Sequence, residues 1–205
     1  MNKLYKKILE IKVIPRFIKI IIIMGINWTF QSLLYLDRTE KVFKVFLDFI
    51  FFISIFLILY YYLSVGVAIF SSIIIAHTIN WIINGHVFAL CKTFGWTKTD
   101  YKTFIDYLNV LKDRSSRENS ICLVATFGSL SRKELKQTSD LDIRVVRKTG
   151  FVNGVRACIF VIKERSKAFF NRFPLDIYLL DNYDGLNELG EAPVIIYSPS
   201  QQIKR

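Results

Sequence analysis

Residues 121–146 read ICLVATFGSLSRKELKQTSDLDIRVV, and this stretch decides the fold of the C-terminal half of the chain. The apolar segment 121–127 predicts a buried strand, because buried strands are short apolar runs that turn residues bound. Gly128 and Ser129 then predict a tight turn, since glycine adopts backbone conformations that other residues avoid. The apolar segment 141–146 predicts a second strand after a polar connection.

Two carboxylates stand where that second strand begins. Asp140 and Asp142 flank Leu141. Successive side chains of a strand point to opposite faces, so both carboxylates share one face. Carboxylates this close repel each other unless a cation lies between them, and oxygen-only donors favour Mg²⁺ or Mn²⁺. The spacing therefore predicts a divalent metal site.

The Gly-Ser turn, the polar spacer and the Asp-x-Asp pair together resemble the minimal nucleotidyltransferase domain of the polymerase-β-type superfamily. The resemblance covers residues 99–197. It implies a third carboxylate on a neighbouring strand, and Asp176 within the apolar segment 175–180 supplies one. It also implies a helix between the second and third strands, where residues 151–170 have a suitable length. The fold class expected is α+β, with a small mixed sheet of the minimal nucleotidyltransferase type preceded by an all-α membrane hairpin.

The resemblance implies a role for each of these residues. Asp140 and Asp142 would hold Mg²⁺ (or Mn²⁺) ions that bridge the nucleotide triphosphate. Asp176 would complete the catalytic metal site nearest the attacking hydroxyl and help to deprotonate that hydroxyl. Gly128 would let the backbone approach the phosphates closely, and Ser129 would donate its hydroxyl to them.

Cations of the loop after the Gly-Ser turn are further candidates for nucleotide binding. Where close relatives in that superfamily carry Arg and Gly, this chain has Leu130 and Lys133. Arg132 and Lys133 are therefore the predicted phosphate contacts, with Lys136 as a third cation nearby. The alternative interpretation of these side chains is an exposed basic loop.

The composition is apolar and basic at once. Of the 205 residues 52% are hydrophobic, and the net charge is +11. This combination favours a membrane protein with a positive cytosolic face over a free nucleic-acid binder. The cysteines, Cys91, Cys122 and Cys158, have no paired spacing, which argues against a zinc site, and reduced thiols fit a cytosolic domain.

A long uncharged segment, residues 49–91, predicts a membrane hairpin. It contains no Asp, Glu, Lys or Arg, and it is about twice as long as the roughly 20 residues that cross a bilayer. Residues 64–66 are the best break, which predicts helices over 43–63 and 67–90. The alternative is one span followed by an amphipathic helix at the membrane interface.

Basic residues on both sides orient this hairpin, because positive segments stay in the cytosol. Both ends, and with them the catalytic domain, are therefore expected in the cytoplasm. We expect a basic amphipathic interfacial segment over 1–42, the transmembrane hairpin over 43–92 and the nucleotidyltransferase-like domain over 93–205. Pro15 is expected to break the helix of the interfacial segment. The flanking cations are Lys3, Lys6, Lys7, Lys12, Arg16, Arg38, Lys41 and Lys44 before the hairpin and Lys92, Lys98 and Lys102 after it.

Four polar residues inside the predicted spans form a candidate membrane polar site. His77, Asn80 and Asn84 recur at helical spacing and share one face of the second helix. An antiparallel hairpin brings Asp48 to about the depth of Ile82, within reach of Asn80 or Asn84. Polar residues at such depth are candidates for function, here in binding the acceptor. The alternative is interhelical hydrogen bonding that fixes the hairpin or an oligomer.

Three functional hypotheses follow from these features. The first is a membrane-anchored, metal-dependent nucleotidyltransferase that moves a nucleoside monophosphate from an NTP, such as ATP, to an acceptor hydroxyl at the cytosolic membrane surface. Its expected partners are the NTP and a membrane lipid or membrane-held acceptor, with no nucleic acid, and a homo-oligomer stays open. The second is a non-catalytic nucleotide-binding regulatory module, which Leu130 and Lys133 favour. The third is an antitoxin-like protein adenylyltransferase, which leaves the hairpin unexplained.

Overall fold

The structure, a computed structural model, describes residues 3–85, 98–187 and 190–199. They belong to two compact units, Met1–Tyr35 and Leu36–Arg205. The first unit is helical, and the predicted break is present. The first helix ends at Glu10, and Pro15 stands directly before the second, where its missing N–H costs no helical hydrogen bond. The elements of this unit are α1 (Lys3–Glu10), α2 (Arg16–Phe30) and the 3-10 helix η1 (Leu33–Tyr35).

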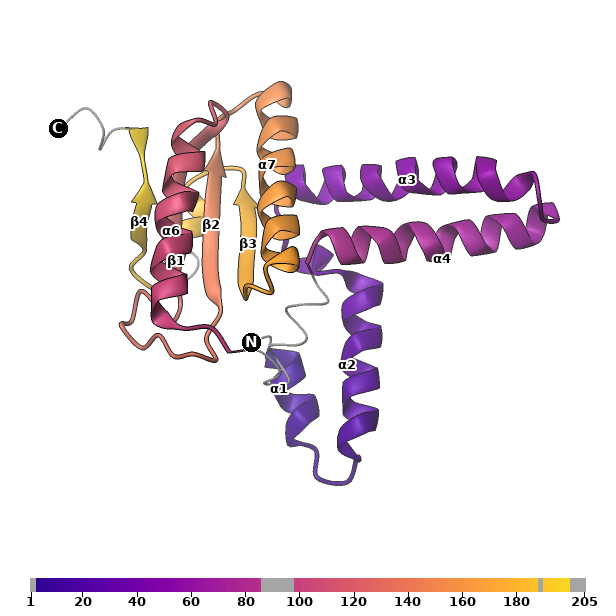
Figure 1. The fold of residues 1–205 in the computed structure, drawn as a ribbon, viewed down its shortest axis with the longest axis horizontal. Helices are drawn as coiled ribbons and strands as arrows, with labels where there is room; N and C mark the ends of the chain where they lie inside the picture. Colours follow the sequence, from indigo (N-terminus) through magenta and orange to yellow (C-terminus); the bar gives the residue numbers. More distant parts are fainter. Residues whose placement is uncertain (1–2, 86–97, 188–189, 200–205) are drawn as a thin grey trace. The chain divides into compact units, whose positions relative to one another are not determined.

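The second unit contains a four-stranded sheet in the order β3-β2-β1-β4 (Figure 1). β1 pairs antiparallel with β2 and with β4, whereas β2 and β3 are parallel. The α+β class with a small mixed sheet is therefore confirmed, and each predicted strand is present. The strands are β1 (Ile121–Phe127), β2 (Leu141–Arg147), β3 (Leu175–Leu180) and β4 (Val194–Tyr197).

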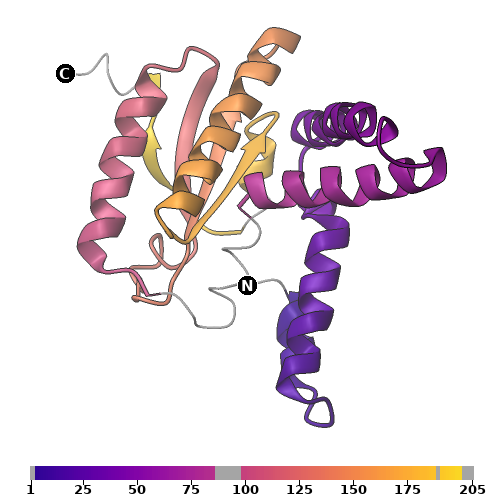
Figure 2. The ribbon, with the colours of Figure 1, turned by 45° about the vertical axis from the view of Figure 1, so that its right-hand side comes forward.

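Helices cover one face of this sheet. α7 (Phe151–Phe170) connects the parallel strands β2 and β3, as a parallel pair requires. α6 (Tyr101–Ser116) lies on the same face beside it (Figures 1 and 2). Asp100 caps its N-terminus, where the Asp100 carboxylate accepts the Thr103 N–H at 2.9 Å.

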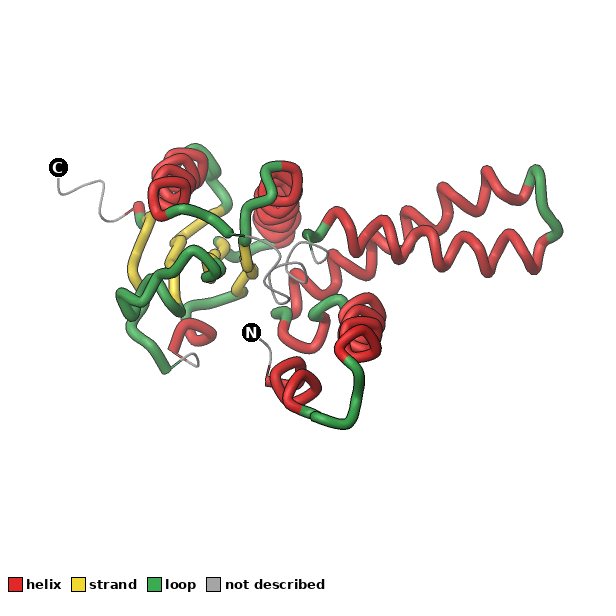
Figure 3. Tube along the Cα trace, turned by 60° about the horizontal axis from the view of Figure 1, so that its bottom comes forward, coloured by secondary structure: helices red, strands yellow, loops and turns green. Residues whose placement is uncertain are grey.

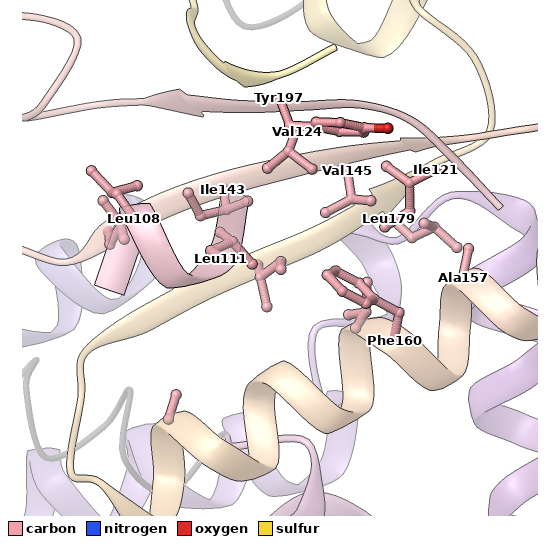
Figure 4. Packing of buried hydrophobic residues seen from close by; sticks show 14 of the residues in the cluster. Leu108, Leu111, Ile121, Val124, Ile143, Val145, Ala157, Phe160, Leu179 and Tyr197 are labelled. Carbon is pink, nitrogen blue, oxygen red and sulfur yellow. The ribbon is translucent and has the colours of Figure 1, made fainter. Parts of the chain in front are cut away.

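The main hydrophobic core fills the space between that face and the two helices (Figure 4). Alternate residues of β2, Leu141, Ile143 and Val145, are fully buried in it. Cys158 also lies in this core, where burial raises the pKa of its thiol to about 12 and keeps the thiol protonated. The opposite face has a smaller cluster made of Leu123, Ala125, Phe127, Val146, Leu180 and Leu186. Leu186 belongs to α8 (Asp184–Asn187), a short helix that follows β3.

The predicted hairpin is present as two antiparallel helices that lie side by side (Figures 1 and 3). α3 (Arg38–Tyr60) begins earlier than predicted, directly after Asp37. α4 (Val65–Ile83) ends earlier, because Asn84 and then Gly85, with φ +72°, terminate it. The predicted continuation over 86–90, including His86, lies outside the described residues.

Both hairpin helices are long and apolar enough to cross a membrane. In the most apolar 18-residue stretch of each helix, only 6% of α3 and 28% of α4 is buried. A core helix of a soluble protein would bury such a surface, and apolar area exposed on this scale marks an interaction or membrane surface. The exposed side chains include Phe46, Phe49, Ile50, Ile53, Leu57 and Ile58 of α3 and Ile69, Phe70, Ile73, Ile74 and Ile75 of α4.

The beginning of α3 covers the free edge of β3. The Leu179 N–H donates to Glu40 Oε2 at 2.7 Å, and the Asp181 N–H donates to Asp37 Oδ2 at 2.8 Å. The Asp181 carboxylate in turn accepts the Thr39 N–H at 3.1 Å. Burial alone would raise the pKa of Asp181, but hydrogen bonds from Thr39 and Arg147 outweigh burial and lower it. Side chains of the hairpin therefore satisfy backbone groups that an open sheet edge would expose.

Arg165 of α7 joins both hairpin helices to β3. Its guanidinium pairs with Glu40 of α3 at 2.5 Å, and both side chains are almost fully buried. It also donates to Asn84 Oδ1 at 2.9 Å and to the Ile177 carbonyl at 3.1 Å. One buried cation thus links α3, the end of α4 and the edge strand β3.

Candidate functional site

Parallel pairing of β2 and β3 places Asp142 directly beside Asp176. Neighbouring residues in register point to the same face of a sheet. Leu141 and Ile143, on either side of Asp142, are buried in the helix-covered core. The two aspartates therefore lie on the opposite face, where both are partly buried. The sheet brings together two of the three carboxylates that the sequence singles out.

Asp140 lies just before β2, at the end of the loop. Its backbone carbonyl accepts the Ser129 hydroxyl at the long distance of 3.5 Å, which joins the two ends of the loop. Across residues 3–85, 98–187 and 190–199, no three His, Cys, Asp or Glu side chains form a group ready to hold a metal ion. The adjacent Asp142 and Asp176 offer the hard oxygen donors that suit a divalent cation. Asp140, two residues before Asp142, is the candidate third ligand.

Gly128 is required at its position by the Asp142 carboxylate. Its φ is +69°, in the left-handed region that favours glycine. A Cβ added there would lie 2.2 Å from Asp142 Oδ2. The turn residue therefore does more than reverse the chain, because its missing side chain leaves the space that the carboxylate occupies.

Gly128→Ala is expected to displace Asp142 and to lower any activity of the site by about 10²-fold, since a shift of about 1 Å in a catalytic group costs that much. The matched control is Gly150→Ala, which places alanine at φ +101° with no contact closer than 3.8 Å. Both variants carry backbone strain, but only the first crowds a carboxylate. Equal activity of the two, measured as product formed per unit of folded protein, would contradict the assignment of Asp142.

The loop after β1 binds a carboxylate of its own chain. The Gly128 N–H donates to Glu191 Oε2 at 3.1 Å. The Ser131 hydroxyl lies 2.9 Å from the Gly128 carbonyl and 3.3 Å from the same Glu191 oxygen, so its one proton can be donated to either. The Arg132 guanidinium pairs with the other oxygen of Glu191. A backbone N–H, a hydroxyl and a guanidinium thus converge on one anion, which is the donor set that phosphate groups also take.

The predicted phosphate contacts of the loop differ in their surroundings. Arg132 is shared between Glu191 and Glu134, and the hydrogen bond to Glu134 and the charge of Glu191 raise the pKa of its guanidinium. Lys133 is exposed and has φ +60°, in the left-handed region of the backbone. The Ser129 hydroxyl is directed to Asp140, as described above, and not to the carboxylate of Glu191.

Two further residues on the carboxylate face were missed in the sequence. Arg144 and Tyr178 are the next register pair on that face after Asp142 and Asp176. The Arg144 guanidinium lies 4.5 Å from the centre of the Tyr178 ring, a cation–π contact. The two-residue alternation that aligns Asp140 with Asp142 also includes Arg144, so the signal was present. Glu191 had no such signal, because it comes from a distant loop.

The four residues of the candidate membrane polar site lie together at the hairpin interface. Asp48 accepts the Asn80 amide at 2.9 Å and shares a hydrogen bond with His77 Nδ1 at 3.1 Å. The Asn84 amide donates to Asn80 Oδ1 at 2.7 Å. Asp48 therefore contacts Asn80, as expected. Because it also contacts His77, Asp48 lies about one helical turn away from Ile82, the residue whose depth it was predicted to share. Asn84 then continues the series of hydrogen bonds to Arg165.

Comparison with known proteins gives no match, either to a protein-family model or to a curated protein sequence. The fold and the site therefore define the class of the molecule at the level of architecture. It is an α+β protein whose small mixed sheet carries paired carboxylates and whose apolar helical hairpin is joined to the sheet edge.

Proposed function

We propose that this protein is a membrane-anchored, metal-dependent nucleotidyltransferase that moves a nucleoside monophosphate from an NTP to an acceptor hydroxyl at the cytosolic membrane surface. One observation carries the proposal. Asp142 and Asp176 stand side by side on the open face of the sheet, next to a loop whose donors already converge on an anion. A cation site beside an anion-binding loop is the combination that a metal–triphosphate complex needs.

In this proposal Asp142 and Asp176 would hold Mg²⁺ or Mn²⁺, with Asp140 as a third ligand. The metal would supply positive charge against the triphosphate and the leaving pyrophosphate. The acceptor oxygen attacks the α-phosphorus as the bond from that phosphorus to the pyrophosphate breaks. Asp176 accepts the proton of the acceptor hydroxyl and releases it to water. The product is the acceptor joined to a nucleoside monophosphate.

The loop would bind the phosphates with the groups that now bind Glu191. A phosphate oxygen would take the Gly128 N–H, the Ser131 hydroxyl and the Arg132 guanidinium, and Glu191 would move away. Arg144 and Tyr178 lie on the same face as the carboxylates and offer a cation and an aromatic ring for the rest of the nucleotide.

The same contacts support a second candidate, a non-catalytic nucleotide-binding regulatory module. Glu191 occupies the anion-binding groups of the loop, and the described residues contain no ready-made group of three metal ligands. A module of this kind would bind nucleotide without turnover. It is distinguished from the enzyme by single-turnover incubation, in which it forms no pyrophosphate.

The hairpin is expected to place the sheet domain in the cytosol. A tag at Ser64, next to the hairpin turn, should be accessible only from outside the cell, and tags at both termini only from inside. Carbonate extraction should leave the chain in the membrane, because exposed apolar helices partition into lipid. Release of the chain by carbonate, or a Ser64 tag that is protected from outside, would contradict two spans.

The nucleotide and the acceptor can be found in one experiment. Native membranes that contain the protein are incubated with each of the four NTPs labelled at the α-phosphate, and lipid and protein fractions are separated. We expect one nucleotide to label the lipid fraction. Label confined to a soluble protein would favour the antitoxin-like alternative.

A further inference from the structure

A groove opens on the hairpin surface beside the Asp48–His77 pair. It has a volume of about 280 Å³. Apart from Asp48 and His77, its walls are apolar, and both helices contribute to them. The lining residues are Val45, Asp48, Phe49, Phe52, Ile73, Ala76 and His77.

Hydrogen bonds hold the Asp48 carboxylate in place at this groove. Asn80 donates one amide hydrogen bond to Asp48 and is itself bound by Asn84, whose side-chain oxygen accepts from Arg165. Asn80 is fully buried, whereas the Asp48 side chain remains 28% exposed and His77 21% exposed. Buried hydrogen bonds therefore hold the Asp48–His77 pair on one side, and its other side is exposed to the groove.

The position of Asp48 along α3 determines which molecules can reach it. The helix continues from Phe49 to Tyr60 toward the hairpin turn, a length of roughly 18 Å at 1.5 Å per residue. The hydrocarbon core of a bilayer is about 30 Å thick. With the turn at the outer boundary of that core, Asp48 lies in its cytosolic half. Water is scarce there, so lipid molecules are the neighbours of this surface.

A carboxylate at this depth is costly unless hydrogen-bond donors surround it. An ionised carboxylate has about four acceptor positions. The contacts given above use two of them, and the buried Lys44, one helical turn earlier, also attracts the Asp48 charge. A ligand that brings a hydroxyl donor on an apolar body would satisfy both the carboxylate and the walls. A groove of about 280 Å³ has room for a small polar head of the size of glycerol.

We propose that this groove binds the hydroxyl-bearing head of a neutral lipid alcohol, with the lipid hydroxyl donating to Asp48. A diacylglycerol is the simplest lipid of this chemistry. The inference rests on the membrane placement proposed above and is independent of the chemistry at Asp142 and Asp176. A lipid held here belongs to the class of hydroxyl acceptors that the proposed transfer requires, and the hairpin would concentrate it next to the sheet domain.

The test compares two lipids that differ only in the hydroxyl. The full chain is reconstituted in phosphatidylcholine nanodiscs that contain either a diacylglycerol or the same lipid with its hydroxyl acetylated. Lipid retained on the released protein is then counted by native mass spectrometry. We expect the free alcohol to be retained about tenfold or more over the acetylated lipid, because a hydrogen bond to a charged group is a strong one in an apolar site.

Three variants locate the binding. Asp48→Asn should remove most of the preference, because the amide is a weaker acceptor. Ile73→Trp should block the groove and leave every hydrogen bond of the polar pair in place. Its loss of lipid retention therefore tests the site even if Asp48→Asn misfolds. Ser54→Ala is the control, since the Ser54 hydroxyl bonds to the Ile50 carbonyl of its own helix. It should keep the full preference.

Two outcomes would overturn the lipid site. One is equal retention of the two lipids by the wild type. The other is a dimer that forms through the groove, excludes lipid and is disrupted by Ile73→Trp. Both leave the proposed transferase untouched, because the binding is measured without nucleotide. Release of the chain by carbonate would instead refute the membrane placement on which both proposals depend.

Discussion

Asp142→Asn is expected to abolish nucleotidyl transfer while leaving the sheet intact. Asp142 is on the open face of the sheet and is not part of the core, so an amide of the same shape should be tolerated structurally. Loss of a group that merely orients a metal ligand costs about 10- to 100-fold, and loss of a ligand should cost at least the upper end of that range. Pyrophosphate release per folded molecule is the measurement.

Asp176→Asn should have an effect of similar size, because the two carboxylates act on one metal complex. The double variant should be little worse than either single variant, since groups that act as a unit are not additive. Asp113→Asn is the control, because Asp113 is exposed on α6 and pairs with Arg117. Undiminished pyrophosphate release by Asp142→Asn and Asp176→Asn would refute the enzyme.

Arg165→Ala is expected to destabilise the second unit by about 3–5 kcal/mol, which is the usual cost of leaving a buried charge without its partner. The substitution would leave Glu40 buried and remove the donor to the Ile177 carbonyl and to Asn84. Glu40→Ala should have an effect of the same order, because it leaves the buried Arg165 guanidinium without its ion-pair partner. Thermal unfolding in detergent, with a probe in the sheet domain, is the measurement.

Arg117→Ala is the matched control for this prediction. Arg117 and its partner Asp113 are both mostly exposed, and exposed pairs contribute about 0–1 kcal/mol. A loss for Arg165→Ala no larger than for Arg117→Ala would show that the hairpin and the sheet edge are not held by this ion pair. Joint replacement of Glu40 and Arg165 by Gln and Met should cost less than either truncation, because it leaves no unpaired charge.

The sheet domain could be predicted from the sequence because its signals are local. The segments over β1, β3 and α7 have the expected bounds, since each is an apolar run or a helical repeat that Gly, Pro or Asp bounds. The pairing of Asp142 with Asp176 followed from the resemblance, which implies neighbouring strands. The bounds of the hairpin helices were less accurate, because an apolar stretch without charges marks its own ends poorly.

The contacts that join distant segments could not be predicted in the same way. Glu191 reaches the loop at Gly128 from a separate part of the chain, and its acidic neighbourhood resembles any solvated turn. Glu40 and Arg165 are buried against β3, and nothing in their local sequence distinguishes them from surface charges. Burial of a charge depends on the tertiary partner, and no periodicity in a single segment reports it.

These long-range contacts connect the two halves of the proposal. The same edge strand that presents Asp176 on one face is held along its free edge by Glu40 and Arg165. The hairpin is therefore part of the structure that positions the carboxylate. A membrane-held acceptor and the nucleotide site would share one rigid support.

The central claim is that the carboxylate pair transfers a nucleoside monophosphate to a membrane acceptor. The most direct measurement incubates the reconstituted protein and Mg²⁺ with membranes and the same nucleotide labelled at either the α- or the γ-phosphate. We expect label from the α-phosphate to enter the membrane fraction in equal amount to the pyrophosphate released. Label from the γ-phosphate should not enter it, and Asp142→Asn should remove both the α-label and the pyrophosphate. Entry of the γ-label, or entry of α-label that Asp142→Asn leaves unchanged, would contradict this claim.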